Sequence, residues 1–396
     1  MNSAKRLFSS TARHLKQKGI PASYYRGGTS RALIFNKKDL PANKDDWKPI
    51  FIGAMGSPDP NGRQLNGMGG GISSLSKICV VNASNHEDAQ VDFTFVQVGI
   101  KNTGLDCAGN CGNMTSAIGP YAMYSGIVDA STSSSPNPKG EDLATVKLYN
   151  TNTQKHIHAT FPISNGEPDL SGSFAIDGVS GTAAKIQLDF IDPAGSKTGT
   201  LLPTGNKIDL INGIRTSCID AGNPCVFVSA SDLNITDLSH LRPDDLQSQP
   251  ELLEKLESIR RQATIRMGMA HSDTDVPPSI PKICIVDTPT GSYRDLSGQI
   301  HQDKEGVDVT VRAISTQQPH KALPITAGLA LSAAARLEGT VVHGVVREPA
   351  REEITIGHPS GTLVVGAKYE EGSRRLERVT VYRTARRLME GVVYWD

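Results

Sequence analysis

Hydrophobic and polar residues alternate over many short stretches of this chain, and glycine-rich turns separate these stretches. In residues 91–98, for example, Val91, Phe93 and Phe95 fall on one face. This is the pattern of a half-buried β-strand. We therefore expect strands at residues 24–25, 32–35, 78–81, 91–98, 146–148, 157–161, 184–190, 225–228, 283–286, 307–314 and 362–365.

Helical periodicity is less frequent than strand periodicity. It predicts helices at residues 47–55, 114–124, 252–267, 327–336 and 384–390. Two of them lie in small-residue segments, MTSAIGPYAMYSGIV and ITAGLALSAAARLEGTV, and each follows a strand and a turn, with Cys111 in the first turn and His320 in the second. Small residues let a helix lie close inside a wrapped sheet. The arrangement predicts two halves of similar design.

The length of 396 residues favours two domains of ordinary size. The segment IDPAGSKTGTLLPTGN (191–206) is rich in turn-forming residues and lies near the middle of the chain. We place one domain at 20–203 and the other at 204–396. Residues 131–140 (STSSSPNPKG) predict a surface loop.

Composition excludes several classes of function. Lysine and arginine together number 41, as do aspartate and glutamate, and no basic stripe accompanies clustered aromatic residues, which argues against nucleic acid. No apolar run approaches the roughly 20 residues that span a bilayer. The six cysteines form no C-x-x-C pair, which argues against a disulfide scaffold and against structural zinc. Cys107 and Cys111 have no further ligands at metal-binding spacing, so we expect no metal.

The first nineteen residues differ from the rest of the chain. They carry five basic residues, several hydroxyl groups and no acidic residue. This composition predicts a mitochondrial transit peptide. The alternative is a disordered basic tail on a cytoplasmic protein.

Cys111 is the first candidate for chemistry. It stands in the turn Gly109-Asn110-Cys111-Gly112-Asn113, directly before a predicted helix. The N-terminus of a helix offers unpaired N–H groups and the positive end of the helix dipole, which favour a thiolate and can hold a carboxylate. A small cysteine buried in a tight turn is the alternative interpretation.

Lys77 is the second candidate. It follows the run Gly67 to Ser76 and precedes an apolar strand, so it stands where a loop enters buried structure. A partly desolvated lysine can transfer protons at neutral pH. The alternative is a lysine whose head remains in water.

Four turns offer hydroxyls, amides and backbone donors that suit a polycarboxylate. They are residues 26–30, 67–77, 203–206 and 220–224, and none has the spacing of a nucleotide-binding loop. Turns are polar for structural reasons as well. His320 and His358 lie in two further loops.

Nine separated motifs occur in an order that resembles one family. They are RGGTSR, GSPDPNGRQLNGMGGGISSLSK, GNCGN, IDPAGSKTG, LLPTGN, IDAGNP, QPHKA, IGHPSG and RTARRLMEG. The chain resembles the methylitaconate isomerase and aconitate delta-isomerase family, called PrpF-like proteins, which has the diaminopimelate epimerase fold. The resemblance implies an α/β protein of two pseudo-symmetric halves, each a curled mixed sheet around a central helix, with the site between them.

The resemblance also implies roles for residues. Cys111 matches the cysteine base of the first half, whereas His320 stands where a second cysteine is usual, which puts a two-thiol racemase in doubt. Lys77 matches the lysine that pairs with this cysteine in the delta-isomerases. The implied substrate-binding residues are Arg26, Thr29, Ser30, Gly69, Gly70, Gly71, Ser73, Asn110, Gly112, Asn113, Thr204, Gly205, Asn206, Asn223 and His320.

The implied reaction removes an allylic proton from an unsaturated di- or tricarboxylate and returns a proton at the other end of the allyl system. It requires no cofactor. The expected partner is the small polycarboxylate, and a homodimer is compatible with the sequence. Two other functions stay open: keto-enol tautomerisation of an oxalomesaconate-type acid, and an accessory role beside an aconitase-like methylcitrate dehydratase.

Overall fold

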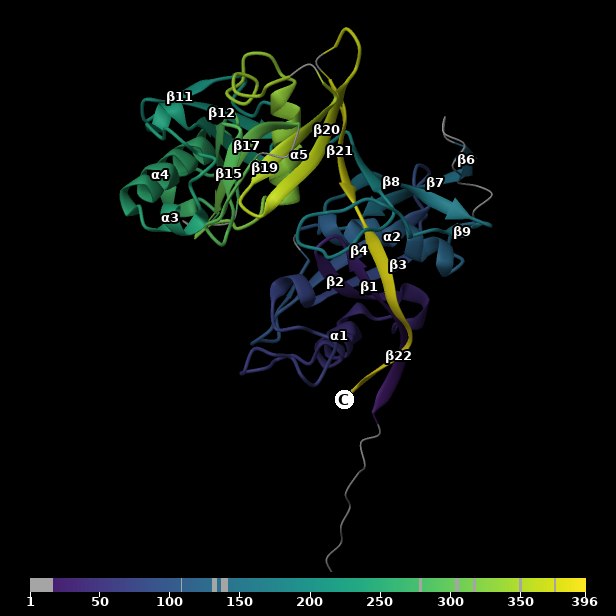
Figure 1. Cartoon of the computed structure of the whole chain (residues 1–396). Helices are drawn as coiled ribbons and strands as arrows, with labels where there is room; N and C mark the ends of the chain where they lie inside the picture. The colour runs from purple at the N-terminus through teal and green to yellow at the C-terminus, as the bar shows by residue number, and fades with distance from the viewer. Residues whose placement is uncertain are drawn as a thin grey trace, which may run out of the picture.

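The computed structural model describes residues 17–107, 109–129, 134–136, 142–277, 280–302, 306–315, 318–348, 351–373 and 375–396 (Figure 1). Its α-helices are α1 (Trp47–Met55), α2 (Gly112–Tyr124), α3 (Pro243–Gln247), α4 (Pro250–Arg266) and α5 (Ile325–Ala335). Short 3₁₀ helices lie at Lys37–Asp39, Lys44–Asp46, Ser73–Leu75, Ser231–Leu233 and Asp273–Asp275.

The strands divide between two lobes (Figure 1). The strands of the first lobe are β1 (Lys18–Gly27), β2 (Ser30–Asn36), β3 (Lys77–Ala83), β4 (Val91–Val98), β5 (Leu105–Asp106), β6 (Ser134–Pro136), β7 (Asp142–Asn150), β8 (Lys155–Ser164), β9 (Glu167–Pro168), β10 (Ile186–Ile191) and β22 (Ala385–Trp395). Those of the second are β11 (Asp209–Ile211), β12 (Ile214–Asp220), β13 (Pro224–Ser229), β14 (Lys282–Asp287), β15 (Ser292–Arg294), β16 (Ile300–Gln302), β17 (Val307–Ser315), β18 (Gln318–Pro319), β19 (Glu353–His358), β20 (Gly361–Tyr369) and β21 (Leu376–Arg383).

In the first lobe a curled mixed sheet surrounds α2. β1 and β2 form a hairpin, β2 and β3 run parallel, and β3 and β4 run antiparallel. Strand alternation sends Cys79 and Val81 into the core around α2, whereas Ile78 and Val80 pack toward α1. The face that holds Cys79 is therefore the face that meets the helix.

The second lobe repeats this plan around α5. β13 and β14 run parallel, β14 and β17 run antiparallel, and α5 packs against β20 and β21. Nearly every residue of α5 is buried, as the small side chains of that segment predict. The predicted fold class, an α/β protein with two similar halves that each wrap a central helix, is confirmed.

Two strands join the lobes into one sheet. β10 pairs with β8 of the first lobe and with β21, and β21 pairs with β20 of the second. β22 then returns and pairs with β1 along its whole length, so both ends of the described chain lie in the first lobe (Figure 1). The division into 20–203 and 204–396 does not anticipate this return.

Most predicted elements are found, and one is wrong. The helix at 384–390 is instead the first part of β22. Thr384 to Glu390 has helix-forming residues, but pairing with β1 outweighs local propensity. The other predicted helices correspond to α1, α2, α4 and α5.

Two further predictions fall largely outside the described residues. Residues 1–16 of the predicted leader or tail are among these, whereas Lys18 and Gly19 already belong to β1. Of the predicted loop 131–140, only the strand β6 is described. Across the described residues, no helix has the length and apolar character needed to cross a membrane.

Candidate active site

Lys77 begins β3 on the strand face that turns toward α2. Its side chain is on the same side as Cys79, because the two are separated by one residue. The residue is 8% exposed, and its Nζ donates a hydrogen bond of 2.6 Å to Oε1 of Gln97. The ring centroid of Phe95 lies 4.9 Å from the same nitrogen. Lys77 is thus a largely buried residue with a hydrogen-bonded amine, which argues against the interpretation that its head remains in water.

Gln97 is held so that its carbonyl oxygen faces Lys77. Its Nε2 donates to the backbone oxygen of Ser76 at 2.8 Å and to that of Ser73 at 3.1 Å. Because the amide nitrogen is occupied by two acceptors, the oxygen has one orientation available. Sequence reasoning did not identify Gln97, since a glutamine in an alternating strand gives no distinctive signal.

Cys111 is the N-cap residue of α2. Its backbone is extended, with φ −104° and ψ 95°, and its side chain makes no capping hydrogen bond. The sulfur instead lies 3.9 Å from Oγ of Ser30, the first residue of β2. Cys111 is partly exposed, and it stands at the N-terminus of α2, as the sequence predicts.

The turn between β1 and β2 closes over the same end of α2. Asn113 Nδ2 donates to Oγ1 of Thr29 at 3.1 Å, and the Thr29 N–H donates to Asn113 Oδ1 at 3.5 Å. Gly28 has φ +50°, and a Cβ there would collide with the Asn113 side chain. The predicted residues Thr29, Ser30, Cys111 and Asn113 are thus brought together.

Lys77 and Cys111 lie at the same end of the first-lobe core. Burial raises the pKa of the Cys79 thiol, the charge of Cys111 raises it further, and that of Lys77 lowers it. The strand register agrees: Ala32 is the parallel partner of Lys77, and Ser30, on the same face two residues earlier, contacts the Cys111 sulfur. The fold places an amine and a thiol on two different elements that converge at the N-terminus of α2.

The N-termini of α2 and α5 meet between the lobes. A Cβ on Gly112 would lie 3.0 Å from the Ile325 side chain. Beside this contact is a cavity of about 570 Å³, lined by Asn110 and Gly112 from the first lobe and by Asn223, Lys282 and Thr326 from the second. Its lining combines these polar groups with apolar side chains such as Phe190 and Leu329, and its volume suits a small ligand.

Lys282 was not identified from the sequence, although a signal was present. The segment KICIV at Lys282 repeats KICVV at Lys77, and both open strands that run parallel to their neighbours. Burial lowers the pKa of His320, and the charge of Lys282 lowers it further. Lys282 thus opens its strand in the second lobe as Lys77 does in the first, and its charge acts on His320.

Other predicted residues have different surroundings. Thr204 Oγ1 donates to Asp209 at 2.6 Å, and Asn206 Nδ2 donates to the same carboxylate at 2.9 Å, so they close the turn that includes Gly205. Arg26 donates to the backbone oxygens of Gly28 and Thr384. Arg26 therefore supports the backbone beside the site, whereas Thr204 and Asn206 support a turn of the second lobe.

The glycine-rich segment Gly69 to Ser73 packs around Gln64. The Gly71 N–H donates to Gln64 Oε1 at 3.0 Å, and a Cβ on Gly69 would collide with the Gln64 side chain. The backbone of Ser73 accepts from Gln97. The segment is therefore connected to Lys77 through Gln97.

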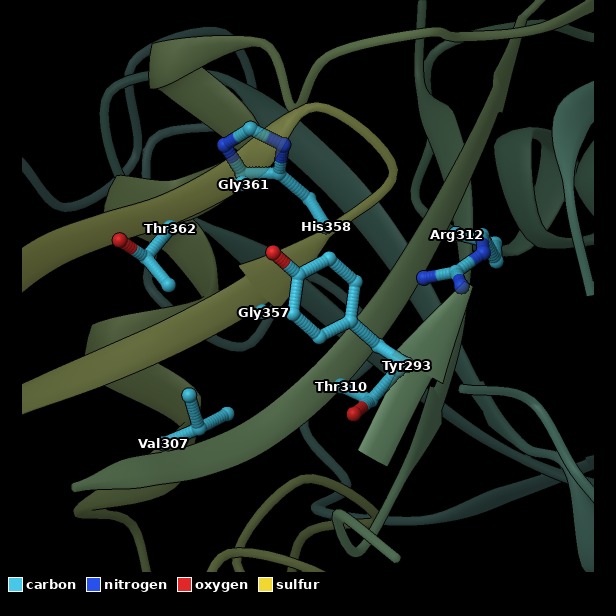
Figure 2. A pocket seen from close by; sticks show the side chains of 8 residues that line it. All are labelled: Tyr293, Val307, Thr310, Arg312, Gly357, His358, Gly361 and Thr362. Atoms are coloured by element: carbon cyan, nitrogen blue, oxygen red, sulfur yellow. The ribbon is translucent and has the colours of Figure 1, made fainter. Parts of the chain in front are cut away.

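A separate, small pocket lies inside the second lobe, between β17 and the end of β19 (Figure 2). His358, Tyr293 and Arg312 line it. The Ser360 N–H donates to His358 Nδ1 at 3.2 Å. Burial lowers the pKa of His358 to about 4, Asp177 opposes this shift, and Arg383 and Arg312 add to it.

We expect His358 to reduce stability in acid. Its folded pKa lies below the ordinary value of 6.5, so its contribution is present above pH 6.5 and is lost as the pH falls toward 4. The loss is up to about 3 kcal/mol of unfolding free energy. His358→Asn keeps an acceptor for Ser360, and urea unfolding from pH 7 to 4 should show a weaker acid dependence in this variant. Equal dependence in the two proteins would contradict this expectation.

Comparisons with known proteins agree with this architecture. The model of the family described as PrpF protein matches residues 17–396. The chain is 36% identical to the 3-methylitaconate isomerase of Eubacterium barkeri, covering 96% of this chain and 97% of that protein. It is 37% identical to the 2-methyl-aconitate isomerase of Shewanella oneidensis (strain MR-1), covering 94% and 96%. The crystal structure of a methylitaconate-delta-isomerase superposes with a TM-score of 0.86 at 35% identity, covering 96% of each chain.

These relatives are bacterial. They give no support to the predicted mitochondrial location.

Proposed function

This chain belongs to the PrpF family and is an isomerase, and we propose that it moves a carbon–carbon double bond within an unsaturated di- or tricarboxylate such as an aconitate or a methylitaconate. The observation that carries the proposal is the convergence of Lys77 and Cys111 at the N-terminus of α2, where Ser30 of the strand beside Lys77 contacts the Cys111 sulfur. Each is held by its own element, so the two can serve different carbons of one substrate.

The proposed reaction has two proton transfers. One group, in its basic form, takes the allylic proton, and the electron pair of that C–H bond delocalises through the double bond into the carboxylate. The other group, in its acidic form, donates its proton to the far end of the allyl system. The double bond has then moved, and each of the two groups has the protonation state that the other began with. Proton transfer to and from water restores the starting states.

Preorganised donors stabilise the charge that develops on the carboxylate in this scheme. The first turn of α2, whose leading N–H groups have no partner within the helix, and the Thr29–Asn113 pair lie beside Cys111. Such donors stabilise an anionic transition state because they are oriented before the reaction begins. The chemistry needs no cofactor, since both protons travel on side chains.

The test is an NMR assay in deuterated buffer with cis-aconitate, trans-aconitate and methylitaconate. We expect isomerisation with one solvent deuteron entering the product at the newly protonated carbon. An oxalomesaconate-type acid belongs in the panel, because conversion of that acid alone would favour the tautomerase alternative. If no acid is isomerised or takes up deuterium, the proposal is wrong and the accessory role becomes the better hypothesis.

A further inference from the structure

Arg383 is a cation that the mechanism above leaves unused. It is the last residue of β21, where the sheet passes from the second lobe into the first. Among the described residues, its buried Nε has no hydrogen-bond partner, and its NH1 donates to the backbone oxygen of Tyr382 at 3.1 Å. Within the described part of the chain, no carboxylate is among the groups that shift the pKa of Arg383.

The strand register places Arg383 on the inner face of the sheet. Val379 and Val381 lie on the same face of the strand as Arg383, because side chains two residues apart point the same way. Both are buried in the core that surrounds α2 and α5. Tyr382 lies on the opposite, outer face, where its hydroxyl meets Glu353. Arg383 therefore projects toward the helices that meet between the lobes.

Two observations locate its charge more closely. The pKa of Arg383 is lowered to about 10 by burial, and the charge of Cys111 opposes this shift. Arg383 in turn lowers the pKa of His358 in the second lobe. The guanidinium is thus within electrostatic reach of the thiol of one lobe and of the histidine of the other.

The backbone next to Arg383 is anchored to the candidate site. The oxygen of Thr384 accepts from the Gly28 N–H at 2.8 Å and from Ser116 Oγ at 3.3 Å. These partners belong to the β1–β2 turn and to α2. The arginine is therefore held at a fixed position relative to Cys111.

Arg383 is partly exposed as a residue, but its Nε is buried. A cation that is partly removed from water without a counter-ion is unfavourable, and an anionic ligand can supply the missing partner. Guanidinium groups bind carboxylates through two parallel hydrogen bonds. We infer that Arg383 binds the substrate carboxylate attached to the carbon that exchanges its proton with Cys111. This inference rests on the proposed function and names the residue that orients the acid in the site.

The test compares Arg383→Gln and Arg383→Lys with the unmodified enzyme. We expect Arg383→Gln to lower kcat/KM about 100-fold, because the buried partner of a carboxylate is lost. Its affinity for the unreactive saturated analogue propane-1,2,3-tricarboxylate, measured by calorimetry, should fall as well. Arg383→Lys should recover part of both, and added guanidinium ion should partly rescue Arg383→Gln.

Arg378→Gln is the matched control. Arg378 lies on the same strand and forms ion pairs with Glu352 and Glu377. The Arg378→Gln variant should bind the analogue with unchanged affinity. If both Arg383 variants are folded and bind the analogue as tightly as the unmodified enzyme, the inference is wrong.

The outcome also separates this inference from the proposed function. Analogue binding is measured without turnover, so an enzyme that binds the tricarboxylate but isomerises no acid would overturn the reaction alone. Should Arg383→Gln fail to fold, the analogue affinity and the KM of Arg383→Lys test the inference. This variant keeps the charge and loses the bidentate hydrogen bonding of the guanidinium. An unchanged affinity in that variant would equally overturn the assignment.

Discussion

Lys77→Ala is expected to lower kcat for isomerisation by about 10³-fold or more, with the fold retained. General acid–base catalysis contributes about 10² to 10⁴ in rate, and an arginine such as Arg383 cannot replace the amine because guanidinium does not release its proton in proteins. The measurement is the initial rate of double-bond migration and of deuterium exchange, each beside a thermal unfolding curve.

Lys77→Met provides the structural control for this prediction. It fills the volume of the lysine stem next to Phe95, so it should be as inactive as Lys77→Ala but more stable. Gln97→Leu keeps the amine and removes its 2.6 Å hydrogen-bond partner. We expect an intermediate loss of about 10-fold, because orientation rather than chemistry is affected. A fully active Lys77→Met enzyme would rule out Lys77 as a proton carrier.

Periodicity and motif order were enough to predict the two halves and the two central helices. Small residues in α2 and α5, and alternation in strands such as β4, are local signals that report burial directly. The prediction failed at β22 because its conformation depends on pairing with β1, some 360 residues away in sequence. Local propensity contains no information about that partner.

The candidate site was predictable to the same extent. Cys111 and Thr29 stand in glycine-flanked turns, which are visible in sequence, and the structure brings them together. Gln97 and Arg383 lie inside regular strands, and only the sheet register shows which face each one occupies. Lys282 is an intermediate case, because the repeated KIC segment could have indicated it.

Cys111→Ser is expected to reduce isomerisation by about 10²-fold or more while it stabilises the protein. A serine hydroxyl is far less acidic than a thiol, so it is a poor proton carrier near neutral pH. Serine is also a preferred N-cap residue, and Cys111 occupies that position with an extended backbone and no capping hydrogen bond. We expect a gain of about 1 kcal/mol in unfolding free energy.

This opposite change in activity and stability separates a catalytic thiol from a packed one. If Cys111 served only to fill space, Cys111→Ser would keep its activity, and Cys111→Ala would lose stability without losing rate. Deuterium exchange adds the assignment of roles, because a variant that lacks only the second proton carrier still exchanges the allylic proton of the substrate. If Cys111→Ser exchanges the proton without isomerising the acid, Lys77 is the base. If Lys77→Met exchanges the proton without isomerising the acid, Cys111 is the base.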